Sequence, residues 1–317
     1  MSFVYITDYV QDPAIESEIL GDNLTMKPSE EVKVLLVWHE HIDKKYLKKF
    51  PNLIGIVRYG VGIDSIDLKE VEKRKLILCN TPDYGVDEVS DSALSMIMNF
   101  NRGITEYNRM AKKLNDTWET NTIDNLRRIK DQHLGVIGAG SIGSSLILKA
   151  KAVGFQVSFF DPYKESGFEK ALGVNRFFTL NEMIKNSDIL SFHIPLNEDT
   201  EGMIDEKFIS KMKEGSTLIN TSRGKILKNL DLLYEPLITG RIKYVGLDVL
   251  PEEPPQSGLF IDAWRSNDEK IVNKVIINPH TSYYSQESYT EMRQSAAQNA
   301  LRIFTEKTPR NVILDAR

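Results

Sequence analysis

The sequence predicts an α/β protein of two domains, one of which is built on a doubly wound parallel sheet. Its 317 residues are more than one ordinary hydrophobic core contains. Short apolar runs alternate with polar stretches of helical spacing, a pattern typical of parallel strands joined by helices. Near the middle, a strand-like run breaks into glycines and then opens a helix-compatible segment, residues 134–153. This order predicts the first crossover of the larger sheet.

Residues 1 to about 80 predict the smaller α/β domain. We expect four strands there, at 3–7, 34–38, 53–59 and 76–79. We expect a helix at 44–49, between the second and third of these strands. The third strand runs into Gly60-Val61-Gly62, where closely spaced glycines let successive backbone N–H groups point outward. Such a turn can hold a carboxylate, although a plain strand-to-helix connection is the commoner reason for it.

The pattern becomes that of one long helix over residues 86–114, with acidic residues in its first turn and apolar residues at helical spacing from Val89 onward. We expect this helix to connect the two domains. The next stretch, 115–130, is polar apart from a few apolar residues such as Trp118. It predicts a subunit contact in a homodimer formed through 86–130, although a lone tryptophan more often only anchors a loop.

The glycines after the central strand have the spacing of a dinucleotide site. Gly138 allows the tight turn, Gly140 leaves no Cβ in the way of a pyrophosphate, and Gly143 lets helix and strand pack closely. The N-terminus of the following helix offers unpaired N–H groups to the anion. Because such a motif also arises by chance, it needs a confirming context.

Asp161 provides that context. It ends the next expected strand, 156–160, and lies 18 residues after Gly143, close to the offset at which a carboxylate accepts the ribose hydroxyls. Alone, an aspartate before Pro162 would be read as a turn former. A carboxylate here repels a 2′-phosphate and the nearest following cation is Lys164, so NAD is favoured over NADP.

Four later apolar runs each end in polar residues. We expect them to be strands at 189–192, 217–219, 244–247 and 275–277. Residues just past the carboxyl ends of parallel strands converge on the crevice that binds the ligand. The sequence therefore brings Arg223, Asp248 and His280 to one edge of the sheet. His193 and Pro195 follow the first of these strands, and we interpret them as a backbone wall for the cofactor.

These side chains suit hydride transfer to a keto acid. Such a reaction needs a proton donor near neutral pH and a cation that orients the acid. A histidine, with an intrinsic pKa of about 6.5, can be the donor if a carboxylate stabilises its protonated form. We assign that role to His280, with its partner in 248–254, and assign the cation to Arg223. A histidine or an arginine considered alone is more often a surface group. The position of both residues at strand ends after a nucleotide-binding motif favours an active site.

Bulk properties exclude other classes. The chain is 41% hydrophobic and 27% charged, and no apolar run approaches the roughly 18 residues that span a membrane. A net charge of −5 gives no reason to expect nucleic acid as a partner. The single cysteine, Cys79, excludes an internal disulfide and fits a reducing compartment. No signal peptide opens the chain, so we expect a cytoplasmic protein, and we expect no metal site.

Taken together, the motifs resemble those of the D-isomer-specific 2-hydroxyacid dehydrogenase family. The matching pieces are GAGSIG at 138–143 with Asp161, NTSRG at 220–224, GLDVLPEEP at 246–254 and NPH at 278–280. With 58–64 and 80–93 added, the resemblance covers nearly the whole chain. Residues 80–91, 161–163 and 280–284 are similar to the branch that includes the C-terminal-binding-protein corepressors, and Tyr283 also resembles D-lactate dehydrogenases.

The resemblance implies a role for each matched residue. Arg223 binds the substrate, His280 is the acid/base, and Glu253 pairs with it, or Glu252 if the register slips by one. The turn Gly60, Val61 and Gly62 would hold the substrate carboxylate, Tyr283 would contact the substrate, and Asp248 would meet the nicotinamide carboxamide. The expected NAD-binding residues are Gly138, Gly140, Ser141, Ile142, Gly143, Asp161, His193, Pro195, Thr200, Thr221, Ser222, Arg223, Asp248 and His280.

The family fold inserts the dinucleotide-binding domain into a smaller, flavodoxin-like substrate domain. We therefore expect a substrate domain of 1–98 with 285–317 and a dinucleotide-binding domain of 99–284, with a last helix over 285–304. The longer, charged link at 261–273 departs from the family pattern, and Arg265 within it is a candidate for the substrate mouth.

The expected activity is the NAD-dependent interconversion of a 2-oxo acid and a D-2-hydroxy acid. The substrate side chain and the direction stay open. The alternative is an NAD(H)-sensing, corepressor-like binding protein. Oxidation of formate is disfavoured, because formate dehydrogenases have a glutamine at the position of Glu253.

Overall fold

The computed structural model describes residues 3–113 and 118–317 and divides into two compact units. The first is Met1–Gly85 with Tyr284–Arg317, and the second is Val86–Tyr283. The boundary expected between residues 98 and 99 falls inside α4 (Val86–Arg102), which packs on strands and a helix of the second unit and so belongs to it. Among the described residues, no helix combines the length and apolar character that crossing a bilayer requires.

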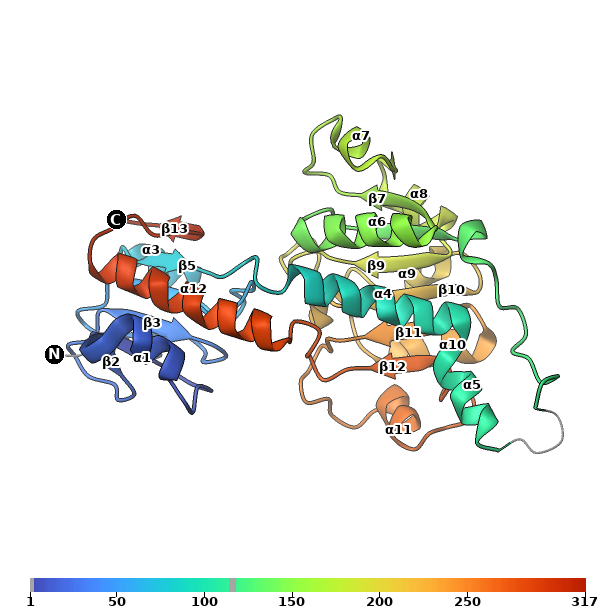
Figure 1. Ribbon diagram of the computed structural model, residues 1–317, viewed down its shortest axis with the longest axis horizontal. Helices are drawn as coiled ribbons and strands as arrows, with labels where there is room; N and C mark the ends of the chain where they lie inside the picture. The colour runs from blue at the N-terminus through green and yellow to red at the C-terminus, as the bar shows by residue number, and fades with distance from the viewer. Residues whose placement is uncertain (1–2, 114–117) are drawn as a thin grey trace. The chain divides into compact units, whose positions relative to one another are not determined.

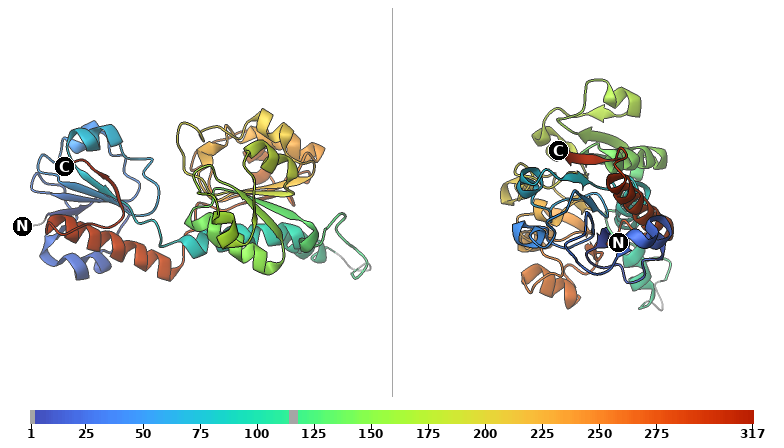
Figure 2. Two further views of the ribbon diagram at one scale, coloured as in Figure 1. Left: turned by 90° about the horizontal axis from the view of Figure 1, so that it is seen from above. Right: turned by 90° about the vertical axis from the view of Figure 1, so that its left-hand side faces the viewer.

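The first unit is a six-stranded sheet with helices on both faces (Figures 1 and 2). Its strand order is β2-β1-β3-β4-β5-β13, in which only β13 runs antiparallel to its neighbour. The first five strands have the flavodoxin-like 2-1-3-4-5 order that we expected. The elements are β1 Val4–Ile6, α1 Ala14–Leu20, η1 Gly21–Asn23, β2 Leu24–Thr25, β3 Val34–Val37, α2 Lys44–Leu47, β4 Gly55–Arg58, α3 Leu68–Lys73, β5 Ile77–Cys79, α12 Gln286–Phe304 and β13 Val312–Asp315.

Local sequence explains where these helices begin. Asp43 and Asp67 cap α2 and α3, because each side chain accepts backbone N–H groups of the first turn. Ser285 and Ser288 form a capping box at the start of α12. On one face of the sheet α12 lies beside α1, and on the other face α2 and α3 enclose a core of strand residues such as Leu35 (Figure 2).

The second unit contains a seven-stranded sheet in which every strand pair is parallel. Its order is β12-β11-β10-β9-β6-β7-β8, so the chain reverses direction across the sheet between β6 and β9. The elements are α4, α5 Ile104–Ala111, η2 Ile129–Asp131, β6 His133–Ile137, α6 Ser141–Val153, β7 Gln156–Phe160, α7 Phe168–Leu172, β8 Asn175–Arg176, α8 Leu180–Asn186, β9 Ile189–Phe192, α9 Glu206–Lys211, β10 Ser216–Asn220, η3 Gly224–Ile226, η4 Asp231–Leu233, α10 Tyr234–Thr239, β11 Ile242–Leu247, α11 Leu259–Arg265 and β12 Val275–Ile277.

Two cores cover this sheet, one on each face. Buried side chains of α4 and α6 pack on one face, and those of α8, α9, α10 and α11 pack on the other (Figure 2). The strands read as continuous apolar runs because both of their faces are buried. The predicted doubly wound sheet, interrupting a smaller α/β unit, is confirmed.

One local prediction was wrong. The single helix expected over 86–114 is two helices, α4 and α5, because Gly103 adopts a left-handed conformation (φ 61°) between them. Leu114 and residues 115–117 of the expected arm lie outside the described residues. The longer, charged link at 261–273 begins within helix α11 (Leu259–Arg265).

Candidate functional site

The glycine turn of the second unit lies at the switch point of the sheet, where open α/β sheets bind ligands. Gly138 has φ 90°, and a Cβ there would come within 2.4 Å of the carbonyl oxygen of His193. A Cβ on Gly143 would come within 2.0 Å of the carbonyl oxygen of Gly138. Gly140 differs, because a Cβ there would meet no protein atom within 4 Å. Gly138 and Gly143 are therefore needed for packing, whereas Gly140 leaves space for a ligand.

Helix α6 begins at Ser141 and Ile142, directly after that space, with Gly140 as its N-cap and no side-chain cap. The N–H groups of its first turn therefore have no intrahelical partner, which is the arrangement that binds a phosphate group. The geometry fits a pyrophosphate at this turn.

Asp161 follows β7 and is joined to the turn directly. Its Oδ2 accepts the backbone N–H of Ala139 at 2.9 Å, and its Oδ1 accepts that of Tyr163 at 2.9 Å. These bonds hold the carboxylate at the end of the strand while each oxygen keeps a further lone pair for a hydroxyl. Sequence reasoning missed Arg176, whose guanidinium donates to the backbone carbonyl of Asp161 at 2.8 Å. No motif identifies this residue, which reaches Asp161 from the neighbouring strand β8.

Two buried polar atoms near the same crevice have no hydrogen-bond partner among the described residues. They are Nδ1 of His193 and Oγ1 of Thr221, at the ends of β9 and β10. Such atoms are costly unless a ligand or water pairs with them. Thr200, also expected at the cofactor, donates its hydroxyl to the carbonyl of Pro195 at 2.7 Å and so fixes the loop after β9. These residues fit a nicotinamide dinucleotide, which is held by polar groups along the strand ends.

His193 is a poor candidate for an acid/base. Burial lowers its pKa to about 4, so the imidazole is neutral near pH 7. Its Nε2 lies 2.8 Å from the hydroxyl of Ser191, which sets the orientation of the ring.

His280 and Glu253 meet at the ends of β11 and β12. Nδ1 of His280 lies 2.7 Å from Oε2 of Glu253, and the backbone N–H of Leu250 donates to Oε1 at 2.8 Å. Burial alone would raise the pKa of Glu253, but the bonds from His280 and Leu250 and the charge of Arg223 lower it below its usual value. The carboxylate is thus held ionised beside the imidazole, whose Nε2 is directed away from this bond. Glu252, the alternative partner, is not in this bond.

The backbone of His280 is held in an uncommon conformation. Its φ is +55°, in the left-handed region that non-glycine residues rarely occupy. Asp248 imposes it: the carbonyl of Asp248 accepts the N–H of His280 at 2.9 Å, and its carboxylate accepts those of Thr281 and Ser282 at 3.0 to 3.2 Å. Burial raises the pKa of Asp248, an effect that these bonds only partly offset. Asp248 therefore positions the loop that carries His280.

Arg223 follows β10 in the motif 220–224. The side chain of Asn220 closes this turn by donating to the carbonyl of Arg223 at 2.9 Å and accepting from the N–H and hydroxyl of Ser222. A Cβ on Gly224 would lie 1.9 Å from the backbone of Leu250, so only glycine lets the turn approach the loop of Glu253. The structure thus brings Arg223, Glu253 and His280 to one edge of the sheet.

Arg265 does not stand free at this edge. From α11 it donates to the carbonyl of Pro255 at 3.0 Å and so fastens the loop that follows Glu253. Tyr283 is half-buried at the last position of the second unit.

The turn at 60–62 belongs to the first unit. Gly60 has φ 107°, and its N–H donates to Oγ1 of Thr81 at 2.5 Å. The side chain of Asn80 donates to the carbonyl of Val61 at 2.8 Å. The N–H of Gly60 is already engaged in this bond. The N–H groups of Val61 and Gly62 are therefore the candidate donors to a substrate.

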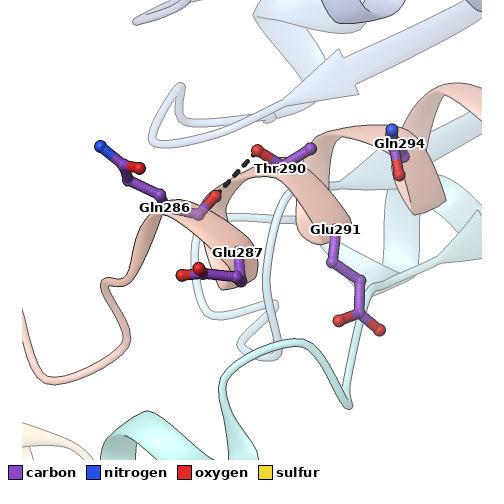
Figure 3. Close-up of a pocket in the computed structure, with 5 residues that line it drawn as sticks. All are labelled: Gln286, Glu287, Thr290, Glu291 and Gln294. Carbon is purple, nitrogen blue, oxygen red and sulfur yellow. Dashed lines mark hydrogen bonds between the residues drawn. The ribbon is translucent and has the colours of Figure 1, made fainter.

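A pocket of about 480 Å³ lies elsewhere in the first unit, on the exposed side of α12 (Figure 3). Its walls carry amides, a hydroxyl and two carboxylates, and no residue of the sites above; they are Gln286, Glu287, Thr290, Glu291 and Gln294. Thr290 donates to the carbonyl of Gln286 (Figure 3). Because the carboxylates would repel an anionic acid, we assign this pocket no role.

Known proteins share both the sequence and the fold. Residues 94–282 match the family described as the D-isomer specific 2-hydroxyacid dehydrogenase, NAD binding domain. A glyoxylate reductase of Korarchaeum cryptofilum is 32% identical over 276 residues, which are 86% of this chain and 79% of that protein. C-terminal-binding protein 1 of Caenorhabditis elegans is 28% identical across 95% of this chain, which spans only 43% of that protein.

Solved structures agree. The D-lactate dehydrogenase of Aquifex aeolicus, complexed with NAD and lactic acid, superimposes with a TM-score of 0.83 at 28% identity, covering 98% of each chain. An NADPH-dependent glyoxylate/hydroxypyruvate reductase of Sinorhizobium meliloti, in complex with NADP and malonate, has the same fold at 20% identity, with a TM-score of 0.83 over 99% of this chain and 97% of that one. The chain belongs to the D-isomer-specific 2-hydroxyacid dehydrogenase family of NAD(P)-dependent oxidoreductases, and its larger unit is the family's NAD(P)-binding domain.

Proposed function

We propose that the protein interconverts a 2-oxo acid and a D-2-hydroxy acid with NAD as its cofactor. The observation that carries the proposal is the pair of His280 and Glu253, 2.7 Å apart at the strand ends beside Arg223. An imidazole held by an ionised carboxylate at the switch point of a dinucleotide-binding sheet suits proton transfer to a carbonyl oxygen.

In the direction of reduction, His280 donates a proton to the carbonyl oxygen as C2 is reduced. The bound cofactor, when reduced, supplies the hydride to C2. Glu253 accepts from Nδ1 of His280, which stabilises the protonated imidazole before transfer and leaves Nε2 to deliver the proton. Asp248 keeps the loop of His280 in the conformation that aims the ring.

Arg223 binds the carboxylate of the substrate. Its planar guanidinium can make two parallel bonds to a carboxylate or to an α-keto acid. We assign the N–H groups of Val61 and Gly62 to the same carboxylate, on the family pattern, and assign contact with the substrate side chain to Tyr283.

The preference for NAD rests on Asp161. Its carboxylate is held within the turn region by Ala139 and Tyr163, where it suits ribose hydroxyls and would repel a 2′-phosphate. The guanidinium of Arg176 also lies here, but its Nη1 and Nη2 already donate to the carbonyls of Glu165 and Asp161.

A kinetic screen tests the proposal. Purified protein is assayed by the loss of reduced-cofactor absorbance with pyruvate, glyoxylate, hydroxypyruvate and branched or aromatic 2-oxo acids, using NADH and NADPH. We expect turnover with NADH, and oxidation of the D but not the L hydroxy acid in reverse. Arg223→Gln should raise KM for the acid by at least about tenfold, since it removes a charged hydrogen-bonding partner. Arg302→Gln, on α12, is the matched control.

The opposite result has a specific meaning. NADH binding without turnover of any 2-oxo acid would contradict the proposal. It would favour the NAD(H)-sensing, corepressor-like alternative, for which the 28% identity to C-terminal-binding protein 1 is the supporting observation.

We also propose a homodimer formed through 86–130. Helix α5 has no buried side chain within the chain, and Ile104 and Trp118 are 58% and 62% exposed. Apolar groups exposed on one segment are typical of subunit contacts. Sedimentation equilibrium should show a dimer, and the double variant Ile104→Ser with Trp118→Ser should be monomeric. A monomeric wild-type protein would contradict this proposal.

A further inference from the structure

Three buried side chains of the first unit form one closed network, the Tyr59–Glu16–Arg293 triad. Oε1 of Glu16 accepts the hydroxyl of Tyr59 at 2.9 Å and Nε of Arg293 at 2.8 Å. Its Oε2 accepts Nη2 of Arg293, which also donates to the carbonyl of Asp12 at 2.6 Å. Glu16 and Tyr59 are fully buried, and Arg293 is 6% exposed. The triad joins α1, the end of β4 and α12.

Joining two helices to a sheet does not by itself require charge. Apolar side chains of similar volume would pack there, and replacing a buried ion pair by them is often neutral or stabilising, because both ions must lose their water. A hydrogen-bonded ion pair differs from apolar packing because hydrogen bonds are directional. They fix the position of each bonded atom. A buried triad of this kind is therefore best explained by what it positions.

Tyr59 is the residue that the triad positions, and it directly precedes the turn at 60–62. Burial and the negative charge of Glu16 raise the pKa of Tyr59 well above its usual value, so the hydroxyl stays a donor. The Tyr59 ring lies 5.5 Å from that of Trp38, and its backbone N–H donates to the carbonyl of Val37 at 2.8 Å. The hydroxyl is thus tied to α1, and the ring and the backbone N–H are tied to the end of β3.

The first two residues of the turn are fastened by other residues. Thr81 exchanges two hydrogen bonds with Gly60, and Asn80 donates to the carbonyl of Val61. The backbone between Tyr59 and Val61 is thus held at both ends, while Val61 itself is 42% exposed. An exposed turn whose first residues are fastened in this way is the arrangement expected of a preorganised set of donors.

We propose that the Tyr59–Glu16–Arg293 triad positions the glycine turn so that the N–H groups of Val61 and Gly62 are preorganised for the carboxylate of the substrate. This inference rests on the proposed function, because it takes the 2-oxo acid as the ligand of the turn. Tyr59, Glu16 and Arg293 are positioning residues, since none of them is assigned a contact with the substrate.

Tyr59→Phe tests the inference with the least disturbance. It removes one hydroxyl, keeps the ring against Trp38 and leaves Glu16 paired with Arg293. KM for the 2-oxo acid should rise about fivefold, the equivalent of one hydrogen bond, with kcat and NADH affinity nearly unchanged. Amide exchange of peptides covering 58–64 should be several-fold faster. Tyr46→Phe is the matched control, since it removes a partly buried hydroxyl of α2 in the same unit.

The outcomes separate this inference from the proposed function. If Tyr59→Phe lowers the melting temperature while KM and amide exchange at 58–64 match those of Tyr46→Phe, the triad is merely structural and the inference is wrong. If the wild-type protein turns over no 2-oxo acid, the proposed function fails and amide exchange alone decides whether the triad positions the turn. Faster exchange in Tyr59→Phe then supports positioning, and unchanged exchange overturns it.

Discussion

His280–Glu253 and Arg293–Glu16 both join a cationic side chain to a carboxylate, but the first pair is open to solvent and the second is closed. The side chains of His280 and Glu253 are 41% and 37% exposed, whereas those of Arg293 and Glu16 are 7% and 0% exposed. The open pair contains an imidazole, which can act as a proton donor or acceptor, and the closed pair contains a guanidinium, which stays protonated in proteins. The first can exchange a proton with a substrate, and the second can only hold a shape.

The comparison also shows how each pair is supported. Glu253 is held by the backbone N–H of Leu250 and by His280, which favour its ionised form. Its side chain nevertheless remains partly exposed to solvent. Glu16 is fully buried, and Tyr59 and Arg293 donate hydrogen bonds to its two oxygens. Removing a partner should therefore abolish chemistry in one pair and stability in the other.

His280→Ala should give the largest effect. Turnover should fall by about a thousandfold or more, because a positioned acid/base contributes factors of this order. NADH affinity, measured by fluorescence titration, should stay within about twofold, since the glycine turn and Asp161 are untouched. His41→Ala, which removes an exposed histidine of the first unit, is the control and should keep wild-type turnover. Near-normal turnover in His280→Ala would remove His280 from the mechanism.

Arg293→Met should give the largest effect on stability. It leaves Glu16 buried without its cation, and breaking a buried pair in this way costs about 3–5 kcal/mol of unfolding free energy. Urea denaturation measures the loss. Lys228→Met breaks the exposed pair of Lys228 with Glu206 and should change stability little. Equal losses in the two variants would mean that burial does not distinguish the pairs.

The sequence predicted the open pair far better than the closed one. His280 and Glu253 lie at strand ends and within short motifs, and the predicted bounds of β7, β9 and β12 agree with the structure. Glu16 and Arg293 are separated by 277 positions, and no local pattern links a helix near the N-terminus to one near the C-terminus. Their pairing depends on the insertion of one unit into the other, which only the whole fold determines.

The sequence failed to predict two other features. The apolar spacing of 86–114 continues across Gly103, so periodicity alone could not show that the chain turns there. The N–H groups of Gly60 and its neighbours looked equivalent in sequence, but a hydroxyl 21 residues away engages that of Gly60. Side-chain partners from distant strands are invisible to motif reading, whereas strand ends are not.

His193 sharpens the comparison, because it is an imidazole with no carboxylate partner among the described residues. Its pKa is lowered by burial from 6.5 to about 4, so the folded state binds its proton less readily than the unfolded state. Its contribution to stability is therefore complete above pH 6.5 and is lost as the pH falls toward 4. Between pH 7 and pH 5 the loss should be about 2 kcal/mol.

His193→Gln isolates this smallest effect. The amide retains a partner for the hydroxyl of Ser191, which lies 2.8 Å from Nε2 in the wild-type protein, but it does not titrate. Unfolding free energies from urea denaturation at pH 7 and pH 5 should fall less in the variant than in the wild type, by that same amount. Parallel decreases in the two proteins would show that His193 is protonated as easily when folded as when unfolded. Burial would then not lower the affinity of the His193 imidazole for its proton.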